Sequence, residues 1–324
     1  MNVQTPYERL WRKRLDALRA VWPAFLAGDH EALHKARVAS RRIRAALPVV
    51  GASAPPAKLK KLRRKMRALT RHLGPIRELD IELGILEKQA EAEEIVSPRA
   101  LSMVRREVAA ERHALGDRLG KESPVAGLKK LIKKLERVAE LGKQKKAKGK
   151  GLRDNETAWR SALAATLMRR AKRLQAALED AGPLYAPERI HGVRIATKKL
   201  RYVLEVAEEA GQPGAKRLVN VLTTEQERLG HLHDLQALLK HVRAAGASPR
   251  VGACLADLTA YADSLERDCR QLHAQFVEGR DAVFDCVRLV RQTLVPAFTP
   301  RRFRPARVSS TGRRARAIRV AKGA

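Results

Sequence analysis

Four basic side chains recur near the N-terminus at spacings of three, four and three residues, a pattern suited to binding an anion. The row consists of His34, Arg37, Arg41 and Arg44. At ~100° per residue these side chains fall within ~80° of one another on a helix, where they form one stripe. A guanidinium group donates paired hydrogen bonds to phosphate and stays charged at neutral pH. The stripe therefore predicts a phosphate-binding surface.

A second copy of this stripe occurs later in the chain. It consists of His191, Arg194, Lys198 and Arg201, and Tyr202 adjoins it. In each copy a Leu-Gly pair and then an acidic residue follow the histidine by about forty residues: Leu73-Gly74 with Glu78, and Leu229-Gly230 with Asp234. Because a duplicated unit is expected to use the same chemistry in both copies, the repeat predicts that both stripes bind the same ligand.

Neither four-residue stripe contains a carboxylate. Like charges at helical spacing repel one another by a few tenths of a kcal/mol, and an anionic ligand would relieve that repulsion. Ten residues of helix span ~15 Å, so each stripe can follow an extended chain of anions and need not surround one small ion. For one stripe alone, a plain solvated basic face is the alternative. Two stripes in matching register favour a linear, polyphosphate-like ligand.

Helical periodicity runs through nearly the whole chain, and no segment shows a convincing strand alternation, which predicts an all-α fold. Apolar residues opposite the two stripes predict buried faces: Ala36, Ala39, Ile43, Leu47 and Val50, then Val193, Ala196, Leu200, Leu204 and Ala207. An earlier helix is predicted by the apolar row Leu15, Leu18, Trp22 and Phe25. We predict further helices near 29–50, 57–73, 75–92, 98–119, 124–141, 155–180, 187–210, 214–230, 232–246, 249–274 and 278–294.

Two basic segments without apolar periodicity divide the chain. Residues 143–150 read Lys-Gln-Lys-Lys-Ala-Lys-Gly-Lys, and such a charge run with glycine is typical of a linker. The segment from residue 295 onward has no acidic residue, which is typical of a basic tail. The predicted organisation is a first helical-bundle repeat at 1–142, a basic linker at 143–153, a second repeat at 154–294 and a basic tail at 295–324.

The overall charge predicts an acidic partner. The 324 residues include 67 Lys and Arg against 35 Asp and Glu, a formal net charge of +32. Only 4% of residues are aromatic, few for a protein that stacks single-stranded bases. No stretch approaches ~18 consecutive apolar residues, so we expect no membrane insertion. The three cysteines include no Cys-x-x-Cys pair, which favours a reducing, intracellular compartment.

At these motifs the sequence resembles the CHAD family, the conserved histidine α-helical domain. The resemblance rests on the H-x-x-R-V/I-x-x-R/K-R/K-x-R pattern in both halves and on the later Leu-Gly-x-x-x-acid pattern, and it covers most of residues 1–294. It implies two duplicated four-helix-type bundles related by pseudo-twofold symmetry around a basic central groove or pore. It also implies binding of inorganic polyphosphate without catalysis or cofactor, in the cytoplasm at polyphosphate granules, or in the nucleus or nucleolus of a eukaryote.

Family members are often fused behind a triphosphate tunnel domain with a Glu-x-Glu-x-Lys signature. Here Glu91-Ala-Glu93 is followed by Glu94-Ile95 and fails that signature.

The predicted polyphosphate-binding residues are Arg14, His34, Arg37, Arg41, Arg42, Arg44, Lys61, His191, Arg194, Lys198, Lys199, Arg201 and Tyr202. The third helix of the first repeat is far more basic than its counterpart, so we expect an electrostatically lopsided groove. Its cations are Lys58, Lys60, Lys61, Arg63, Arg64, Lys65, Arg67 and Arg71, against Lys216, Arg217 and Arg228 in the second repeat.

Two other functions fit parts of the pattern. A basic helical stripe also suits the phosphates of nucleic acid, but base readers mix in Asn, Gln and Ser, so any such binding is expected to be non-specific and salt-dependent. A helical metal-dependent phosphohydrolase would draw its ligands from His191, His231, His233, Asp234 and Asp257. The first repeat has Arg77-Glu78 in place of His233-Asp234, and neighbouring cations oppose a divalent metal. We therefore expect no metal site and no catalysis.

Overall fold

The computed structural model describes residues 6–26, 29–72, 74–91, 97–121, 127–144, 152–248 and 251–299. Every regular element in these ranges is helical, which confirms the predicted all-α class. The first half comprises α1 (Pro6–Leu26), α2 (His30–Val50), α3 (Pro56–His72), α4 (Gly74–Glu91), α5 (Pro98–Lys121) and α6 (Leu128–Gln144). The second comprises α7 (Leu152–Ala181), α8 (Pro187–Glu209), α9 (Ala215–Gly246), a 3₁₀ turn (Gly252–Cys254), α10 (Leu255–Leu289), a π-helical turn (Val290–Leu294) and α11 (Val295–Phe298).

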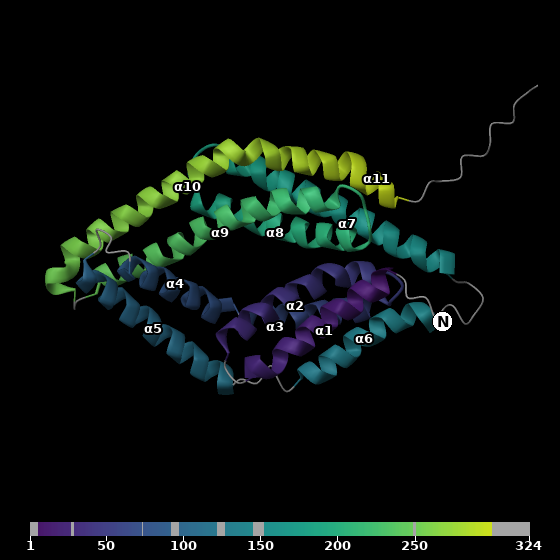
Figure 1. Cartoon of the computed structure of the whole chain (residues 1–324), viewed down its shortest axis with the longest axis horizontal. Coiled ribbons are helices and arrows are strands. Elements are labelled where there is room, and N and C mark those ends of the chain that lie inside the picture. The colour runs from purple at the N-terminus through teal and green to yellow at the C-terminus, as the bar shows by residue number, and fades with distance from the viewer. Residues whose placement is uncertain are drawn as a thin grey trace, which may run out of the picture.

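The two halves lie along opposite long sides of an elongated molecule (Figure 1). In the second half α8 packs between α7 and α9, and α9 packs along α10. In the first half α1 packs along α2, and α4 packs along α5. The halves meet where α2 contacts α7 and α8, and again where α4 and α5 contact α9. The two stripe-bearing helices, α2 and α8, are therefore in direct contact.

The apolar faces predicted from the sequence form the core. The ten residues opposite the stripes are all buried, as is the row Leu15, Leu18, Trp22 and Phe25 of α1. Burying these faces leaves the stripe residues of α2 and α8 on the polar sides of the same helices. The hydrophobic pattern thus fixes which way the basic side chains point.

Two predicted helix breaks do not occur. The sequence prediction ended a helix at residue 230, but α9 continues through Gly230 because Leu229, Leu232 and Leu235 are buried on both sides of it. A helical glycine costs only ~1 kcal/mol relative to alanine, which such burial outweighs. In the first repeat the corresponding Gly74 is followed by Pro75, which suits the first turn of a new helix, and α4 begins there.

The second missing break is the gap predicted between 274 and 278, which α10 spans. Gly279 lies just beyond this gap, where α10 approaches α9 closely. A Cβ atom at this position would lie 2.8 Å from Nη1 of Arg228 and 2.9 Å from Oε1 of Glu225. The glycine here therefore permits close helix packing and does not end the helix.

The helical body also extends past residue 294, where the predicted tail begins. In α11 the buried Phe298 lies 6.1 Å from Trp159, centroid to centroid, and Arg160 donates to the carbonyl of Ala297 at 3.0 Å. Residues 145–151 of the predicted linker and 300–324 of the predicted tail lie outside the described residues. None of the helices in the described ranges is both long enough and apolar enough to cross a membrane.

Candidate anion-binding site

The stripes of α2 and α8 meet at their middle residues, which we call the central cluster: Arg37, Arg41, Arg194 and Lys198. Burial, and then the charges of Arg194 and Arg41, lower the pKa of Lys198 to about 7. Burial and the charge of Arg41 lower the pKa of Arg37 to about 10. The two stripes thus come close enough to repel one another. Such a cluster favours an anionic ligand, which would stabilise the charged forms.

Both copies of the Leu-Gly motif contribute to the central cluster. In the first copy the guanidinium of Arg37 donates to the backbone carbonyl of Gly74, the first residue of α4. In the second copy a guanidinium nitrogen of Arg194 lies 3.9 Å from a carboxylate oxygen of Asp234 on α9. Burial raises the pKa of Asp234, although the charges of Arg194 and Lys198 oppose that shift. The motif therefore supplies a backbone acceptor and the nearby charge of Glu78 in the first copy, and the carboxylate of Asp234 in the second.

A second group of cations, which we call the basic flank, gathers side chains from four helices. Its members are Arg44 of α2, Arg63 and Arg67 of α3, Arg170 and Arg173 of α7, and Lys199 of α8. Burial and then the nearby cations lower the pKa values of Arg44 and Lys199, and that of Arg170 to about 10. Among the described residues, the neighbouring charges that act most strongly on these three groups are all positive.

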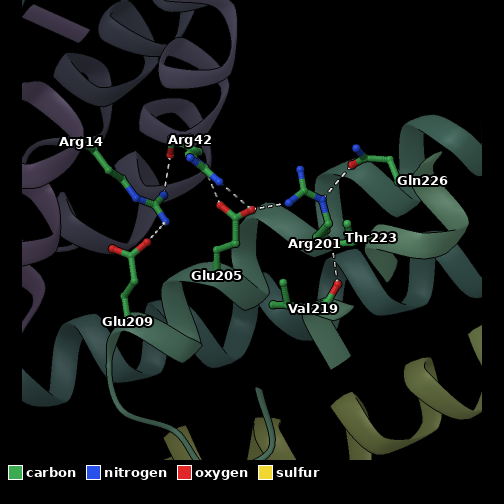
Figure 2. Close-up of polar contacts among 8 residues, drawn as sticks. All are labelled: Arg14, Arg42, Arg201, Glu205, Glu209, Val219, Thr223 and Gln226. Carbon is green, nitrogen blue, oxygen red and sulfur yellow. Dashed lines mark hydrogen bonds and ion pairs between the residues drawn. The ribbon is translucent and has the colours of Figure 1, made fainter. Parts of the chain in front are cut away.

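A third group, which we call the neutralised flank, pairs its arginines with carboxylates (Figure 2). Its members are Arg14, Arg42, Arg201, Glu205 and Glu209. Arg42 donates to Glu205 from Nε at 2.9 Å and from Nη2 at 3.4 Å, and Arg201 donates to the same carboxylate. Arg14, with only 3% of its side chain exposed, donates to Glu209 at 3.1 Å and to the carbonyl of Arg42 at 2.7 Å.

These ion pairs change the electrostatics of the predicted binding residues on this side. Burial acts to lower the pKa of Arg42, but the hydrogen bond and charge of Glu205 outweigh it, and the pKa is raised. Arg201 also donates from Nε to the side chain of Gln226 on α9 at 2.8 Å. Three of the residues predicted to bind a ligand are thus already held by the protein's own acceptors.

The family model of the CHAD domain matches residues 9–243 of the chain. The chain belongs to the CHAD domain family. The match contains both stripes and both Leu-Gly motifs, and it ends within α9. All three groups of basic residues described above therefore lie inside the CHAD domain.

Two solved structures share this fold. The crystal structure of the CHAD domain from the plant Ricinus communis is 22% identical, with a TM-score of 0.51, over 89% of this chain and 91% of that one. PptA from Streptomyces chartreusis is 14% identical, with a TM-score of 0.54, over 89% of this chain and 98% of that one. No curated protein sequence matches the chain. At these identities the two structures establish the fold alone.

The first histidine of each motif copy, His34 or His191, has a lowered pKa in this environment. Burial, followed by Arg77 and Arg37, lowers the pKa of His34, and burial and Arg194 lower that of His191. His191 also faces His233, with 3.4 Å between the two Nδ1 atoms, and burial lowers the pKa of His233 to about 3. The histidines are therefore neutral at pH 7 in the absence of a ligand, and the arginines carry the positive charge.

Two predicted binding residues remain, Tyr202 and Lys61, of which one is buried and the other exposed. Tyr202 is buried, and the guanidinium of Arg201 lies 4.6 Å from its ring centroid, so the ring makes a cation–π contact with that arginine. Lys61 is exposed on α3. The α3 residues whose charges act on Arg44 are Arg63 and Arg67, two and six residues beyond the position predicted.

Arg170 and Arg173 belong to the basic flank but were not among the predicted binding residues. They lie on α7, outside both stripes, and only the fold brings them beside Arg44 and Lys199. The basic run Arg169-Arg170-Ala171-Lys172-Arg173 is the sequence signal that identifies this surface. Arg77, which lies inside the first Leu-Gly-x-x-x-acid motif, was likewise not assigned to the site, although its charge acts on His34 and Arg37.

The metal-hydrolase alternative requires a cluster of metal ligands. Within the described ranges, no group of three or more His, Cys, Asp or Glu side chains is arranged to hold a metal ion. His191 and His233 are adjacent, but the neighbouring charges that act most strongly on His233 include Arg194 and Lys198. This surrounding charge is unfavourable for a divalent cation.

Proposed function

We propose that this CHAD-domain protein binds inorganic polyphosphate, without catalysing its breakdown, over the central cluster and the basic flank. The observation that carries the proposal is the convergence of ten cations from α2, α3, α7 and α8, where burial and then mutual repulsion lower the pKa values of several of them. A linear polyanion can contact many of these groups at once. Each contact contributes ~1.5–3 kcal/mol at best, and less where water screens it, so several must act together.

A flexible, narrow anion suits this surface better than a nucleic-acid duplex. Arg37 is 7% exposed and the side chain of Arg194 is 13% exposed, so both are largely enclosed by neighbouring helices. A rigid duplex makes its phosphate contacts to cations that project from a surface. Polyphosphate has one charged group per unit and no bases to accommodate, which is consistent with the low aromatic content of the chain.

Competition binding tests this function. Labelled long-chain polyphosphate is bound to the full chain at ~150 mM salt and displaced with orthophosphate, unlabelled polyphosphate, duplex DNA, RNA or heparin at equal charge concentration. We expect unlabelled polyphosphate to compete best, orthophosphate to compete poorly, and the affinity to fall as salt rises. Stronger competition by DNA or RNA would show that the site is a non-specific nucleic-acid interface. Release of orthophosphate during the assay would contradict a non-catalytic role.

The cellular location follows from the same proposal. A protein that binds long polyphosphate chains is expected to accumulate where the polymer does. For an intracellular protein this means polyphosphate granules in the cytoplasm, or the nucleus or nucleolus in a eukaryotic cell. Imaging a fluorescent fusion in cells with and without polyphosphate tests it, and an unchanged distribution would contradict it.

A further inference from the structure

Glu205 is a buried carboxylate beside the two basic stripes. It lies one helical turn after Arg201, only 8% of its side chain is exposed, and it accepts hydrogen bonds from both Arg42 and Arg201 (Figure 2). One turn later, Glu209 accepts from Arg14. A phosphate would use the same guanidinium donors that these carboxylates now occupy. The protein's own anions therefore take the place of a ligand here.

The sequence repeat shows that this feature belongs to one side alone. With His34 aligned to His191, an offset of 157 residues, Arg201 and Arg42 correspond to Arg44 and Lys199 of the basic flank. Pro48 and Ala52 then stand where the second copy has Glu205 and Glu209. The two flanks thus contain equivalent pairs of cations, but only one pair has carboxylates one turn away.

The third helix of each repeat strengthens the difference. With Gly74 aligned to Gly230, an offset of 156 residues, Arg63 and Arg67 correspond to Val219 and Thr223. Figure 2 shows Val219 and Thr223 beside Arg201, where Thr223 donates its hydroxyl to the carbonyl of Val219 at 2.8 Å. These two positions therefore add cations to the basic flank, whereas the equivalent positions at the neutralised flank are uncharged.

Space does not limit a ligand at the neutralised flank. A pocket of about 950 Å³ opens there between α1, α2, α8 and α9, and its lining includes Arg42, Arg201 and Glu205. Glu208 and Glu209 also line it. A polyanion entering this pocket would have to displace a buried carboxylate and leave that carboxylate without its partners, which is unfavourable. Lys13, Arg14 and Lys35 also line the pocket, so it is the pairing of Arg42 and Arg201 with Glu205, and not the size of the pocket, that disfavours an anionic chain here.

We propose that Glu205 ends the polyphosphate site, so that a bound chain extends over the basic flank and the central cluster and stops before Arg42 and Arg201. This inference rests on the proposed function and adds the residue that sets how many phosphate units the protein holds. Beyond that number, additional units gain no further contacts. The site is then open to a longer chain in one direction only.

The direct test measures affinity for polyphosphates of increasing length, from tripolyphosphate to long chains, in the wild type and in Glu205→Gln. Glutamine keeps the size and an acceptor for the arginines but removes the charge. The control is Glu208→Gln, which lines the same pocket and changes the net charge by the same amount. We expect Glu205→Gln to raise affinity several-fold for long chains, with little change for tripolyphosphate, and to move the plateau to longer chains. Equal changes at all lengths, or equal changes in the two variants, would overturn the proposal.

A reciprocal variant keeps the test independent of the folding of Glu205→Gln. Pro48→Glu places a carboxylate one turn after Arg44, as Glu205 follows Arg201. We expect this variant to lose affinity for long chains several-fold and to reach its plateau at shorter lengths, while circular dichroism shows unchanged helicity. No loss in a folded Pro48→Glu protein would contradict the proposal. Absence of polyphosphate binding by the wild type at every length is a different result, since it would overturn the proposed function itself.

Discussion

At the basic flank Arg44 lies near Arg63 and Arg67, whereas at the neutralised flank the equivalent Arg201 contacts Glu205 and Gln226. Both arginines end the same repeated motif, and both lie on a helix with a buried apolar face. The motif therefore determines where the side chains stand, but not what surrounds them. Neighbouring residues, several of them outside the motif, decide whether each arginine is available to a ligand.

The two flanks also contribute differently to stability. The ion pairs of the neutralised flank join α1 and α2 to α8, and so hold the two halves of the molecule together. At the far end His241 of α9 plays a similar part, because it lies 2.6 Å from Glu82 of α4 and 3.1 Å from Glu111 of α5. The hydrogen bond that His241 donates to Glu82 raises the pKa of His241 to about 9, so this contact is charged at neutral pH. In the part of the chain that the structure describes, the cations of the basic flank lie close together and no carboxylate pairs with them.

The largest effect is expected on stability at the neutralised flank. Glu205→Ala leaves Arg201, whose side chain is 11% exposed, without its carboxylate. Loss of one partner from a buried ion pair costs ~3 kcal/mol. Urea unfolding followed by circular dichroism measures this change. Arg63→Gln with Arg67→Gln, at the basic flank, should leave the free energy of unfolding within ~0.5 kcal/mol of the wild type. Equal losses in both variants would remove the distinction between the flanks.

The next effect is on binding at the basic flank. Arg63→Gln with Arg67→Gln removes two exposed cations, and we expect affinity for long-chain polyphosphate to fall about tenfold, which is ~1.4 kcal/mol. The matched control is Lys129→Gln with Lys133→Gln, which removes two exposed cations with the same spacing from α6. It should lose less than about twofold. A control that loses as much as the test variant would mean that only the net charge of the protein matters.

A smaller effect is expected from pH at the central cluster. The charges that act on Lys198 are Arg194 of α8, Arg37 and Arg41 of α2, and Asp234 of α9. Because the pKa of Lys198 is about 7, its positive charge is present below that pH and is lost as the pH rises through it. Polyphosphate affinity should therefore fall roughly threefold between pH 6 and pH 8. Lys198→Arg, whose charge is permanent, should flatten this profile, and an identical slope in both proteins would contradict the assignment.

The sequence was sufficient for the features that depend on local pattern. The apolar faces of α2 and α8 predicted which residues are buried, and the repeated stripe predicted which side of each helix carries the basic residues. It was not sufficient where the outcome depends on a partner helix. Glu205 was not identified because its pairing with Arg42 needs the fold to bring α2 to α8. Gly230 was predicted to break a helix because its effect depends on the burial of its neighbours.

Packing against a partner helix also decides which cations of α3 belong to the basic flank. All eight basic residues of this helix are visible in the sequence, but only the packing of α3 beside α2 shows which of them act on Arg44. Lys61 was predicted, whereas the structure places Arg63 and Arg67 there. Arg170 and Arg173 were missed for a related reason, because α7 carries no copy of the motif. Tertiary neighbours, and not the motif itself, determine the extent of the basic surface.

Lysine footprinting tests the central claim most directly. An amine-acylating reagent is applied to the protein with and without long-chain polyphosphate, and the modification of Lys199 and Lys13 is measured by mass spectrometry. Lys199 is an exposed residue of the basic flank, and Lys13 is an exposed residue that lines the pocket at the neutralised flank. We predict that polyphosphate protects Lys199 and leaves Lys13 reactive, and that orthophosphate at equal phosphate concentration protects neither. Equal protection of both lysines, or protection of Lys13 alone, would contradict this account.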